Sequence, residues 1–146
     1  SFLLDTNVLV YRVDPRDRRK QRLATALIRD GIASGEARVP HQAVLEFVAA
    51  TTRTSRGGGP SLLTREEAVQ EVEELLLMLP VLYPTEPVLR LALRGWMAYG
   101  LSWFDAHLWA FAEHHGIGTI YSEDFQHGRR YGEVLVLDPF LSTSSP

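Results

Sequence analysis

The sequence predicts an α/β fold: a single domain in which helices flank a central, mainly parallel sheet. Its 146 residues fall within the usual size of one domain. Short apolar runs alternate with amphipathic stretches along the chain, which is the pattern of βαβ units. No internal repeat and no long linker interrupts this alternation. We therefore expect one domain over residues 1–141, followed by a short C-terminal tail at residues 142–146.

Five short apolar runs predict the strands of the sheet. They are residues 2–4, 37–39, 81–83, 119–121 and 134–137. Because helical stretches separate most of these runs, neighbouring strands are expected to be parallel.

The first three predicted helices lie in the N-terminal half of the chain. A short one is indicated from Val8 to Tyr11. After the turn at Asp14-Pro15, apolar residues at helical spacing define a longer helix that we expect to end at Gly31. Pro40 then opens a third helix, which ends before the glycine-rich loop at Gly57.

Three later helices are marked by polar residues at their starts. Thr64 and Glu67 form a capping box, in which each side chain can accept a hydrogen bond from the other residue's backbone amide. Thr85 opens the next helix, and Ser102 opens the last one, which is expected to end at Gly116.

The composition excludes several classes of site. The chain has no cysteine, so a disulfide scaffold, a cysteine zinc site and a thiol nucleophile are all ruled out. No run of about eighteen apolar residues could span a bilayer. We expect a soluble cytoplasmic protein with no membrane partner, because a reducing compartment fits a chain without disulfides.

The charge distribution leaves room only for a local nucleic-acid contact. The formal net charge is −3 and the pI is near 5.9, well below the value typical of nucleic-acid-binding domains. Lys20 is the only lysine among 15 basic residues. Arginine suits phosphate, although a GC-rich genome also favours arginine, and the sequence does not decide between these explanations. The basic residues crowd one stretch, Arg12, Arg16, Arg18, Arg19, Lys20 and Arg22, with smaller groups at Arg53, Arg56, Arg129 and Arg130.

Four acidic residues stand out because they border apolar runs instead of polar helix faces. Asp5 directly follows the first predicted strand, and Asp124 follows the fourth by a short turn. Glu46 and Asp105 lie in early turns of predicted helices. The carboxyl ends of parallel strands, and the starts of the helices after them, meet at one edge of the sheet. We therefore expect these four carboxylates to converge.

A cluster of four carboxylates needs a counterion. Two like charges about 4 Å apart repel by about 4 kcal/mol at an effective dielectric near 20, so a bare cluster would partly protonate. Oxygen ligands with no cysteine and no paired histidine favour Mg²⁺ or Mn²⁺ over zinc. Such an ion can activate a water and neutralise charge on a leaving oxygen, so the cluster predicts phosphodiester hydrolysis.

Each acid also has a simpler interpretation that the sequence leaves open. Asp5 could serve only to cap a short helix, and Asp105 could serve only in a capping box with Ser102. Glu46 could lie on a solvated stripe, and Asp124 could be a turn residue. Only the convergence of all four at one predicted edge favours a shared site.

Polar and aromatic neighbours are assigned lesser roles. Thr6 and Ser122 could orient a carboxylate or a metal-bound water. The five histidines show no ligand spacing on a common face, and we expect no metal role for them. Four aromatic residues on apolar helical faces are expected in the core or at a dimer surface: Trp96, Trp103, Trp109 and Phe111.

Four segments resemble the acidic motifs of the PIN-domain family, in particular the VapC-type toxins of bacterial and archaeal toxin–antitoxin pairs. Each segment contains one of the four acids, and the motifs occur in the family's order. The segments are residues 2–9, 44–47, 102–108 and 120–128. The likeness covers nearly the whole chain and ends at Asp138-Pro139-Phe140, where many relatives have asparagine in place of Asp138.

The resemblance implies a Mg²⁺- or Mn²⁺-dependent endoribonuclease with RNA as its substrate. It also implies a homodimer and a cognate antitoxin that neutralises the protein. By motif position, the metal ligands or activators of a metal-bound water are Asp5, Glu46, Asp105 and Asp124, supported by Asn7, Ser122 and Thr6, with Glu123 as an additional candidate ligand.

Other classes fit the sequence less well. A haloacid-dehalogenase-type phosphatase needs a second aspartate two residues after the first, where this chain has Asn7. A receiver domain needs a lysine near its end, whereas the only lysine is Lys20. The remaining alternative is a PIN-like module that binds RNA or protein without cutting, and an assay for metal-dependent cleavage separates it from the enzyme.

Overall fold

The computed structural model describes residues 1–54 and 57–141 of the chain. Arg56 and the predicted tail at residues 142–146 lie outside the described residues. Within this part there are six strands and six helices, and a pair of helices follows each of the first three strands. The strands are β1 (Phe2–Leu4), β2 (Ala37–Pro40), β3 (Val81–Leu82), β4 (Thr119–Tyr121), β5 (Arg130–Tyr131) and β6 (Val134–Leu137). The helices are α1 (Thr6–Val13), α2 (Arg18–Ser34), α3 (His41–Thr52), α4 (Arg65–Met78), α5 (Glu86–Tyr99) and α6 (Trp103–His114).

The six strands form one sheet in the order β3-β2-β1-β4-β6-β5. All neighbouring pairs are parallel except β5 and β6, which form an antiparallel pair at one edge. β1 lies in the middle, with Leu4 opposite Tyr121 of β4. The predicted α/β class with a mainly parallel sheet is confirmed.

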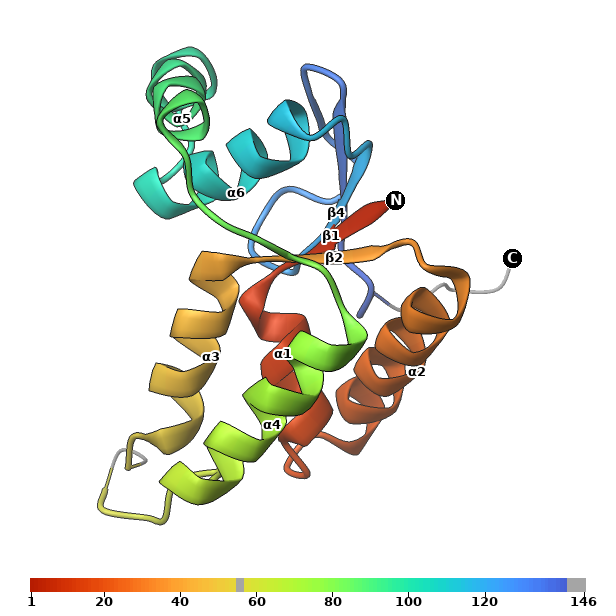
Figure 1. Ribbon diagram of the computed structural model, residues 1–146, viewed down its shortest axis with the longest axis vertical. Helices are drawn as coiled ribbons and strands as arrows, with labels where there is room; N and C mark the ends of the chain where they lie inside the picture. The colour runs from red at the N-terminus through yellow and green to blue at the C-terminus, as the bar shows by residue number, and fades with distance from the viewer. Residues whose placement is uncertain (55–56, 142–146) are drawn as a thin grey trace.

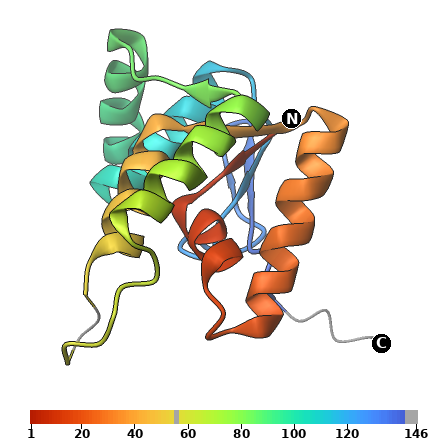
Figure 2. The same ribbon diagram turned by 60° about the horizontal axis from the view of Figure 1, so that its bottom comes forward.

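Helices cover both faces of the sheet. Helices α5 and α6 lie on one side, and α1 to α4 lie on the other (Figure 1). Figure 2 shows the same separation after rotation, with α2 on the opposite side from α5. Because successive strand residues point to opposite faces, Leu3 packs in the core cluster under α5 and α6, whereas Leu4 packs in the cluster under α1 to α4. A sheet covered on both faces explains why β1 and β6 are entirely apolar.

The caps read from the sequence form as expected at the later helices. Thr64 and Glu67 make both hydrogen bonds of the predicted capping box at the start of α4. Thr85 caps α5 through the backbone amide of Val88, and Ser102 caps α6. These local interactions depend on residues three apart in sequence, which is why the sequence predicts them.

The predicted end of α2 at Gly31 is wrong. The helix continues to Ser34 and ends at Gly35, which has the left-handed conformation (φ 72°) typical of a helix C-terminus. Gly31 is buried inside the helix because α2 crosses the sheet closely there. A Cβ at Gly31 would lie 2.7 Å from both the Phe2 ring and the Ala37 Cβ. The glycine therefore permits a close approach of helix and sheet.

The sequence did not predict strand β5. β5 contains only Arg130 and Tyr131 and pairs with β6 through a tight turn at Gly132, which has φ 62°. Two residues are too few to show an alternating pattern. No helix in the described part of the chain has the length and hydropathy to cross a bilayer.

Candidate functional site

The site lies at the edge of the sheet where the parallel strands end. β1 and β4 end side by side at Leu4 and Tyr121. Asp5 follows β1 immediately, and the segment from Ser122 to Asp124 follows β4. Helix α1 begins at Thr6, so its first turn starts at the same edge. The backbone therefore brings together residues that are more than one hundred positions apart in sequence.

Asp5 is the most buried of the four acids, with 5% of its surface exposed. Its Oδ2 accepts a hydrogen bond from the Ser122 hydroxyl (2.6 Å), and its Oδ1 accepts one from the Thr6 backbone amide (2.7 Å). Burial raises the pKa of Asp5 to about 6, the hydrogen bonds from Ser122 and Thr6 oppose this rise, and the negative charges of Asp124 and Asp105 add to it. Asp5 caps α1 and also belongs to the acidic cluster, so its two interpretations are compatible.

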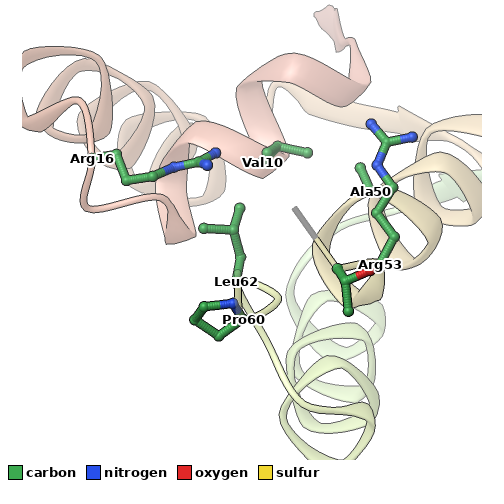
Figure 3. Close-up of a pocket in the computed structure, with 7 residues that line it drawn as sticks. Val10, Arg16, Ala50, Arg53, Pro60 and Leu62 are labelled. Carbon is green, nitrogen blue, oxygen red and sulfur yellow. The ribbon is translucent and has the colours of Figure 1, made fainter. Parts of the chain in front are cut away.

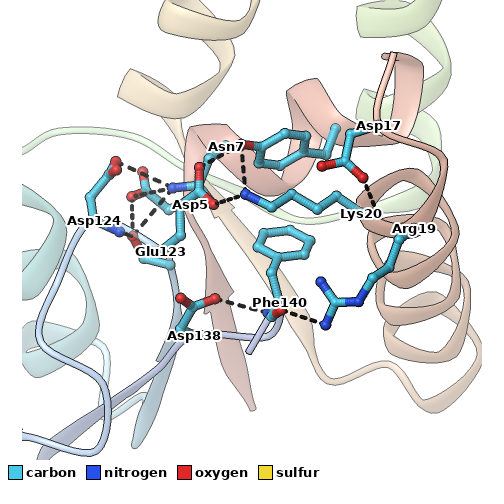
Figure 4. Close-up of polar contacts among 11 residues, drawn as sticks. Asp5, Asn7, Asp17, Arg19, Lys20, Glu123, Asp124, Asp138 and Phe140 are labelled. Atoms are coloured by element: carbon cyan, nitrogen blue, oxygen red, sulfur yellow. Dashed lines mark hydrogen bonds and ion pairs between the residues drawn. The ribbon is translucent and has the colours of Figure 1, made fainter. Parts of the chain in front are cut away.

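Asn7 connects the two sides of the site. Its Nδ2 donates to Asp124 Oδ2 (3.2 Å) and lies 3.4 Å from both Asp5 Oδ2 and Ser122 Oγ (Figure 4). The Ser122 hydroxyl oxygen also accepts the backbone amide of Asp124 (3.1 Å). Asn7 Oδ1 is buried and has no hydrogen-bond partner among the described residues. An unpartnered oxygen beside several carboxylates is a suitable position for a water or a hard cation.

Glu46 is held next to this group by α1. The Thr6 hydroxyl donates to Glu46 Oε2 at 2.8 Å, which joins the first turn of α1 to the middle of α3. Glu46 is half-buried and does not belong to a fully solvated stripe. The predicted support residues therefore have specific partners: Thr6 contacts Glu46, Ser122 contacts Asp5, and Asn7 contacts Asp124.

Asp105 joins the cluster by electrostatics and not through a direct contact with the other acids. It lies in the first turn of α6, where its backbone amide donates to Ser102 Oγ (3.2 Å). Partial burial raises the pKa of Asp105, and the nearby charges of Asp124 and Glu46 raise it further, although the Ser102 hydrogen bond opposes them. Asp105 is thus within electrostatic reach of each of the other three acids, Asp5, Glu46 and Asp124.

Glu123 is engaged elsewhere. Its Oε2 accepts a hydrogen bond from Lys20 Nζ (2.8 Å), and its Oε1 accepts one from the Tyr11 hydroxyl (2.7 Å). Lys20 also donates to the Tyr11 hydroxyl (3.1 Å) and lies over the rings of Tyr11 and Phe140. We call Lys20, Tyr11 and Glu123 the lysine clasp. It ties the loop that carries Asp124 to α1 and α2.

The lysine clasp was missed by the sequence analysis. Lys20 was noted only as the single lysine among arginines, and Tyr11 only as the end of a short helix. Glu123 lies 103 positions from Lys20 along the chain, and no local pattern connects residues so far apart. The arginine surplus around Lys20 was the only available signal.

The donor set fits a hard divalent cation, but the side chains do not form a closed metal cage. Within residues 1–54 and 57–141, no three acidic or histidine side chains are close enough to hold an ion by themselves. Mg²⁺ keeps several waters and is often bound through one or two carboxylates, so a closed cage is not required. All four acids carry carboxylate oxygens, and Asn7 Oδ1 is a further oxygen without a hydrogen-bond partner among the described residues. The residues present therefore fit Mg²⁺ or Mn²⁺.

Fold and site together define a class: α/β proteins that gather acidic side chains at the carboxyl edge of a parallel sheet. A family model for the PIN domain matches residues 2–133. The chain therefore belongs to the PIN domain family, which confirms the resemblance found in the sequence. No curated protein sequence matches the chain.

Several solved structures share this fold. FitAcB from Neisseria gonorrhoeae is 20% identical with a TM-score of 0.63, and the match covers 96% of this chain and 99% of that chain. DNA-bound VapBC from Salmonella typhimurium is 14% identical with a TM-score of 0.67, covering 95% and 98%. VapC20 from Mycobacterium tuberculosis, a toxin that cleaves the sarcin–ricin loop, is 18% identical with a TM-score of 0.62, covering 85% and 90%. At these identities the likeness shows the fold.

Proposed function

We propose that this protein is a Mg²⁺- or Mn²⁺-dependent endoribonuclease that hydrolyses phosphodiester bonds of RNA. The observation that supports this most strongly is the gathering of Asp5, Glu46, Asp105 and Asp124 at one edge of the sheet, where the charge of each nearby acid raises the pKa of Asp5 or Asp105. A protein stabilises such a cluster only at a cost in electrostatic free energy. A function that requires a bound cation explains why the protein retains this electrostatically unfavourable cluster.

The chain's own residues position the carboxylates. Ser122 fixes one oxygen of Asp5, the Asn7 amide fixes Asp124 Oδ2, and the Thr6 hydroxyl fixes Glu46 Oε2. Among the described residues, Asp124 Oδ1 and Glu46 Oε1 accept no hydrogen bond, so each remains available as a ligand. When bound, a divalent cation would supply water activation and charge neutralisation at the leaving oxygen.

A carboxylate whose pKa is about 6 can also exchange a proton near neutral pH. Asp5 has this property because it is buried beside other acids. A general base is most effective when its pKa is close to the working pH. In the metal-free site the Asp5 carboxylate can therefore hold a proton. Cation binding would favour the ionised form of this carboxylate.

We further propose that the protein is the toxin of a type II toxin–antitoxin pair and acts in the cytoplasm. Its structural neighbours include a toxin–antitoxin complex from Klebsiella pneumoniae. The expected partners are a cognate antitoxin, which would cover the acidic site, and a second copy of this chain. A cytoplasmic location agrees with an RNA substrate and with the absence of cysteine from the sequence.

Incubation of the purified protein with total RNA tests the proposal. We expect cleavage with Mg²⁺ or Mn²⁺ and loss of cleavage in EDTA, with restoration when the metal is returned in excess. Full activity in chelator would remove the metal requirement. Binding of RNA without cleavage under every metal condition would identify a non-cutting PIN module instead. Sequencing the ends of the fragments would also identify the preferred RNA.

A further inference from the structure

A cavity lined by two arginines lies between α1 and α3, away from the four acids. Its volume is about 470 Å³, and it is bounded by the C-terminal halves of the two helices and by the segment before α4. The charged lining residues are Arg16 and Arg53, and none of the described lining residues is acidic. Figure 3 shows the two arginine side chains coming from opposite sides of the cavity, with Val10 and Leu62 between them and Ala50 beside Arg53.

Arg16 is held in place at the rim of this cavity. Its Nε donates to Asp14 Oδ1 (2.9 Å) and its Nη2 donates to Asp14 Oδ2 (2.8 Å). Asp14 itself is buried, with 5% of its surface exposed. A guanidinium group has five N–H donors in a fixed plane, so several remain available after this paired contact. The contact with Asp14 limits the motion of the Arg16 head and reduces the entropy lost when it binds a ligand.

The cavity and the acidic site occupy two ends of one surface. Thr6 of α1 donates to Glu46 of α3, and Val10 and Ala50 each lie four residues further along the same helices. Residues four apart lie on the same face of a helix. Arg53 lies seven residues beyond Glu46, which corresponds to about 10 Å along α3 at 1.5 Å per residue. Arg53 therefore continues the face of α3 that carries Glu46, and Arg16 lies in the segment between α1 and α2 that borders the same cavity.

The two ends have opposite electrostatic roles toward a polyanion. The acidic end repels RNA until a cation is present, and the formal net charge of the protein is −3. A strand cut at the acids needs positive contacts nearby, but far enough away that they do not neutralise the cation ligands. Exposed charges separated by about 10 Å are largely screened from each other at physiological salt. Arginine is well suited to phosphate because its planar fork can donate two parallel hydrogen bonds.

We propose that Arg16 and Arg53 bind a backbone phosphate of the RNA strand that is cut at the acidic site. This inference rests on the proposed function and adds a second subsite to it. The contact is made with the sugar–phosphate backbone, so it positions the strand without reading its sequence. The arginines explain how an acidic protein can hold RNA with a local contact.

The test compares Arg53→Gln and Arg16→Gln with Arg90→Gln. Arg90 is a matched control because it is an exposed α5 arginine that forms an ion pair with Glu86, four residues away. The probe is a fluorescent twelve-nucleotide RNA. Cleavage in Mn²⁺ gives KM and kcat, and fluorescence anisotropy in EDTA gives Kd over a range of salt concentrations. Circular dichroism establishes that each variant is folded.

Either variant in the cavity should raise Kd and KM by about three- to tenfold while leaving kcat nearly unchanged. The slope of log K against log salt should decrease by about 0.7 for each lost phosphate contact. Arg90→Gln should match wild type in KM, kcat, Kd and the salt slope. If Arg16→Gln and Arg53→Gln match Arg90→Gln as well, the phosphate subsite is overturned.

The cleavage assay in Mn²⁺ and the binding assay in EDTA separate this inference from the proposed function. If wild type cuts no RNA but the salt slope in EDTA still depends on Arg53, the nuclease assignment fails and the phosphate subsite stands. A third measurement uses a poly-glutamate peptide as the probe. If the variants keep RNA binding and lose peptide binding, the cavity takes an acidic protein segment, and the phosphate proposal is overturned.

Discussion

Asp5 shows how a single side chain can combine structural and chemical roles. Its carboxylate caps α1 through the Thr6 amide and is buried against Ser122. A neutral helix cap would satisfy the same backbone group, because asparagine is nearly as good a cap as aspartate. The cap therefore does not explain why a charged group is buried beside other acids.

Asp5→Asn is expected to separate stability from activity. Cleavage in Mn²⁺ should fall by orders of magnitude, because one anionic ligand is lost. In EDTA the variant should be more stable than wild type near neutral pH. The gain is at most about 3 kcal/mol, which corresponds to a pKa raised from 3.8 to about 6. The loss of a hydrogen bond that asparagine cannot accept reduces this gain. Thermal unfolding in EDTA and cleavage rates in Mn²⁺ measure the two effects.

The pH dependence of this stability difference has a definite sign. A raised pKa in the folded protein means that folding favours protonated Asp5, so this group's favourable contribution is present below about pH 4 and is lost as pH rises through about 6. The stability advantage of Asp5→Asn in EDTA should therefore grow between about pH 4 and pH 7. Asp17→Asn is the matched control, because Asp17 caps α2 outside the acidic cluster. A variant at Asp5 that cuts RNA at the wild-type rate would remove this residue from the active site.

At the scale of elements, α2 is positioned by a glycine that the sequence analysis interpreted as a helix end. Gly31 places the helix backbone against Phe2 and Ala37. The local sequence shows only that glycine is a poor residue for a helix interior. The reason for its presence is a contact with strands that lie before and after the helix.

Gly31→Ala should destabilise the protein even though alanine favours helices. The added Cβ would lie 2.7 Å from the Ala37 Cβ, which cannot rotate away. Overpacking of this kind costs about 1–3 kcal/mol, and improved helix propensity returns up to about 1 kcal/mol. Chemical denaturation should show a net decrease in the free energy of unfolding. Thr25→Ala, at an exposed position of the same helix, should show none, and an equal or higher stability of Gly31→Ala would contradict the close contact.

The lysine clasp joins α1 and α2 to the loop after β4. Lys20 and Glu123 are about three-quarters buried, with 26% and 23% of their side chains exposed. The hydrogen bonds to Glu123 and Tyr11 raise the pKa of Lys20. The ammonium group is therefore favoured in the folded state, and its contribution to stability persists until the pH rises into the range where lysine loses its proton.

Lys20→Met should lower stability by about 1–2 kcal/mol, because a partly buried charged hydrogen bond is lost while the apolar stem is kept. Arg22→Met, an exposed basic residue of the same helix, serves as the control. A double-mutant cycle with Glu123→Gln measures the coupling directly. Additive effects of the two substitutions would show that the clasp does not act as a unit.

At the scale of the whole molecule, the sequence has a surplus of apolar and aromatic residues at residues 76–82 and 101–111, and such a surplus is a candidate dimer surface. The structure buries Ala106 and the run from Leu108 to Phe111 in the second segment, whereas Phe104 is 64% exposed. Leu77 at the end of α4 is 87% exposed, and Met97 of α5 is 81% exposed. α5 also exposes Leu89, Leu93 and Trp96, which share one helical face with Met97. This α5 face is the broader apolar stripe.

We expect a homodimer formed through the α5 face. Met97→Glu should give a monomer by light scattering at micromolar concentration, because a charge in an apolar interface is costly to bury. Leu77→Glu, which changes the exposed end of α4, should leave the dimer intact. Dissociation by Leu77→Glu alone would place the interface on α4, and a wild-type monomer would remove the expectation altogether.

The sequence by itself determined the features that depend on short-range chemistry. Capping residues three apart predicted the starts of α4, α5 and α6, and apolar runs predicted five of the six described strands. The order of strands and helices then placed four acids at one predicted edge, which is a rule of topology and needs no detailed packing.

Only the tertiary structure decided which side chains meet. Thr6 contacts Glu46 across 40 positions, and Asn7 contacts Asp124 across 117. The lysine clasp, the close approach at Gly31 and the arginine cavity likewise depend on how the helices pack over the sheet. A sequence pattern reports the periodicity of one element, whereas these contacts are set by the relative placement of several elements, which is determined by burial of the whole core.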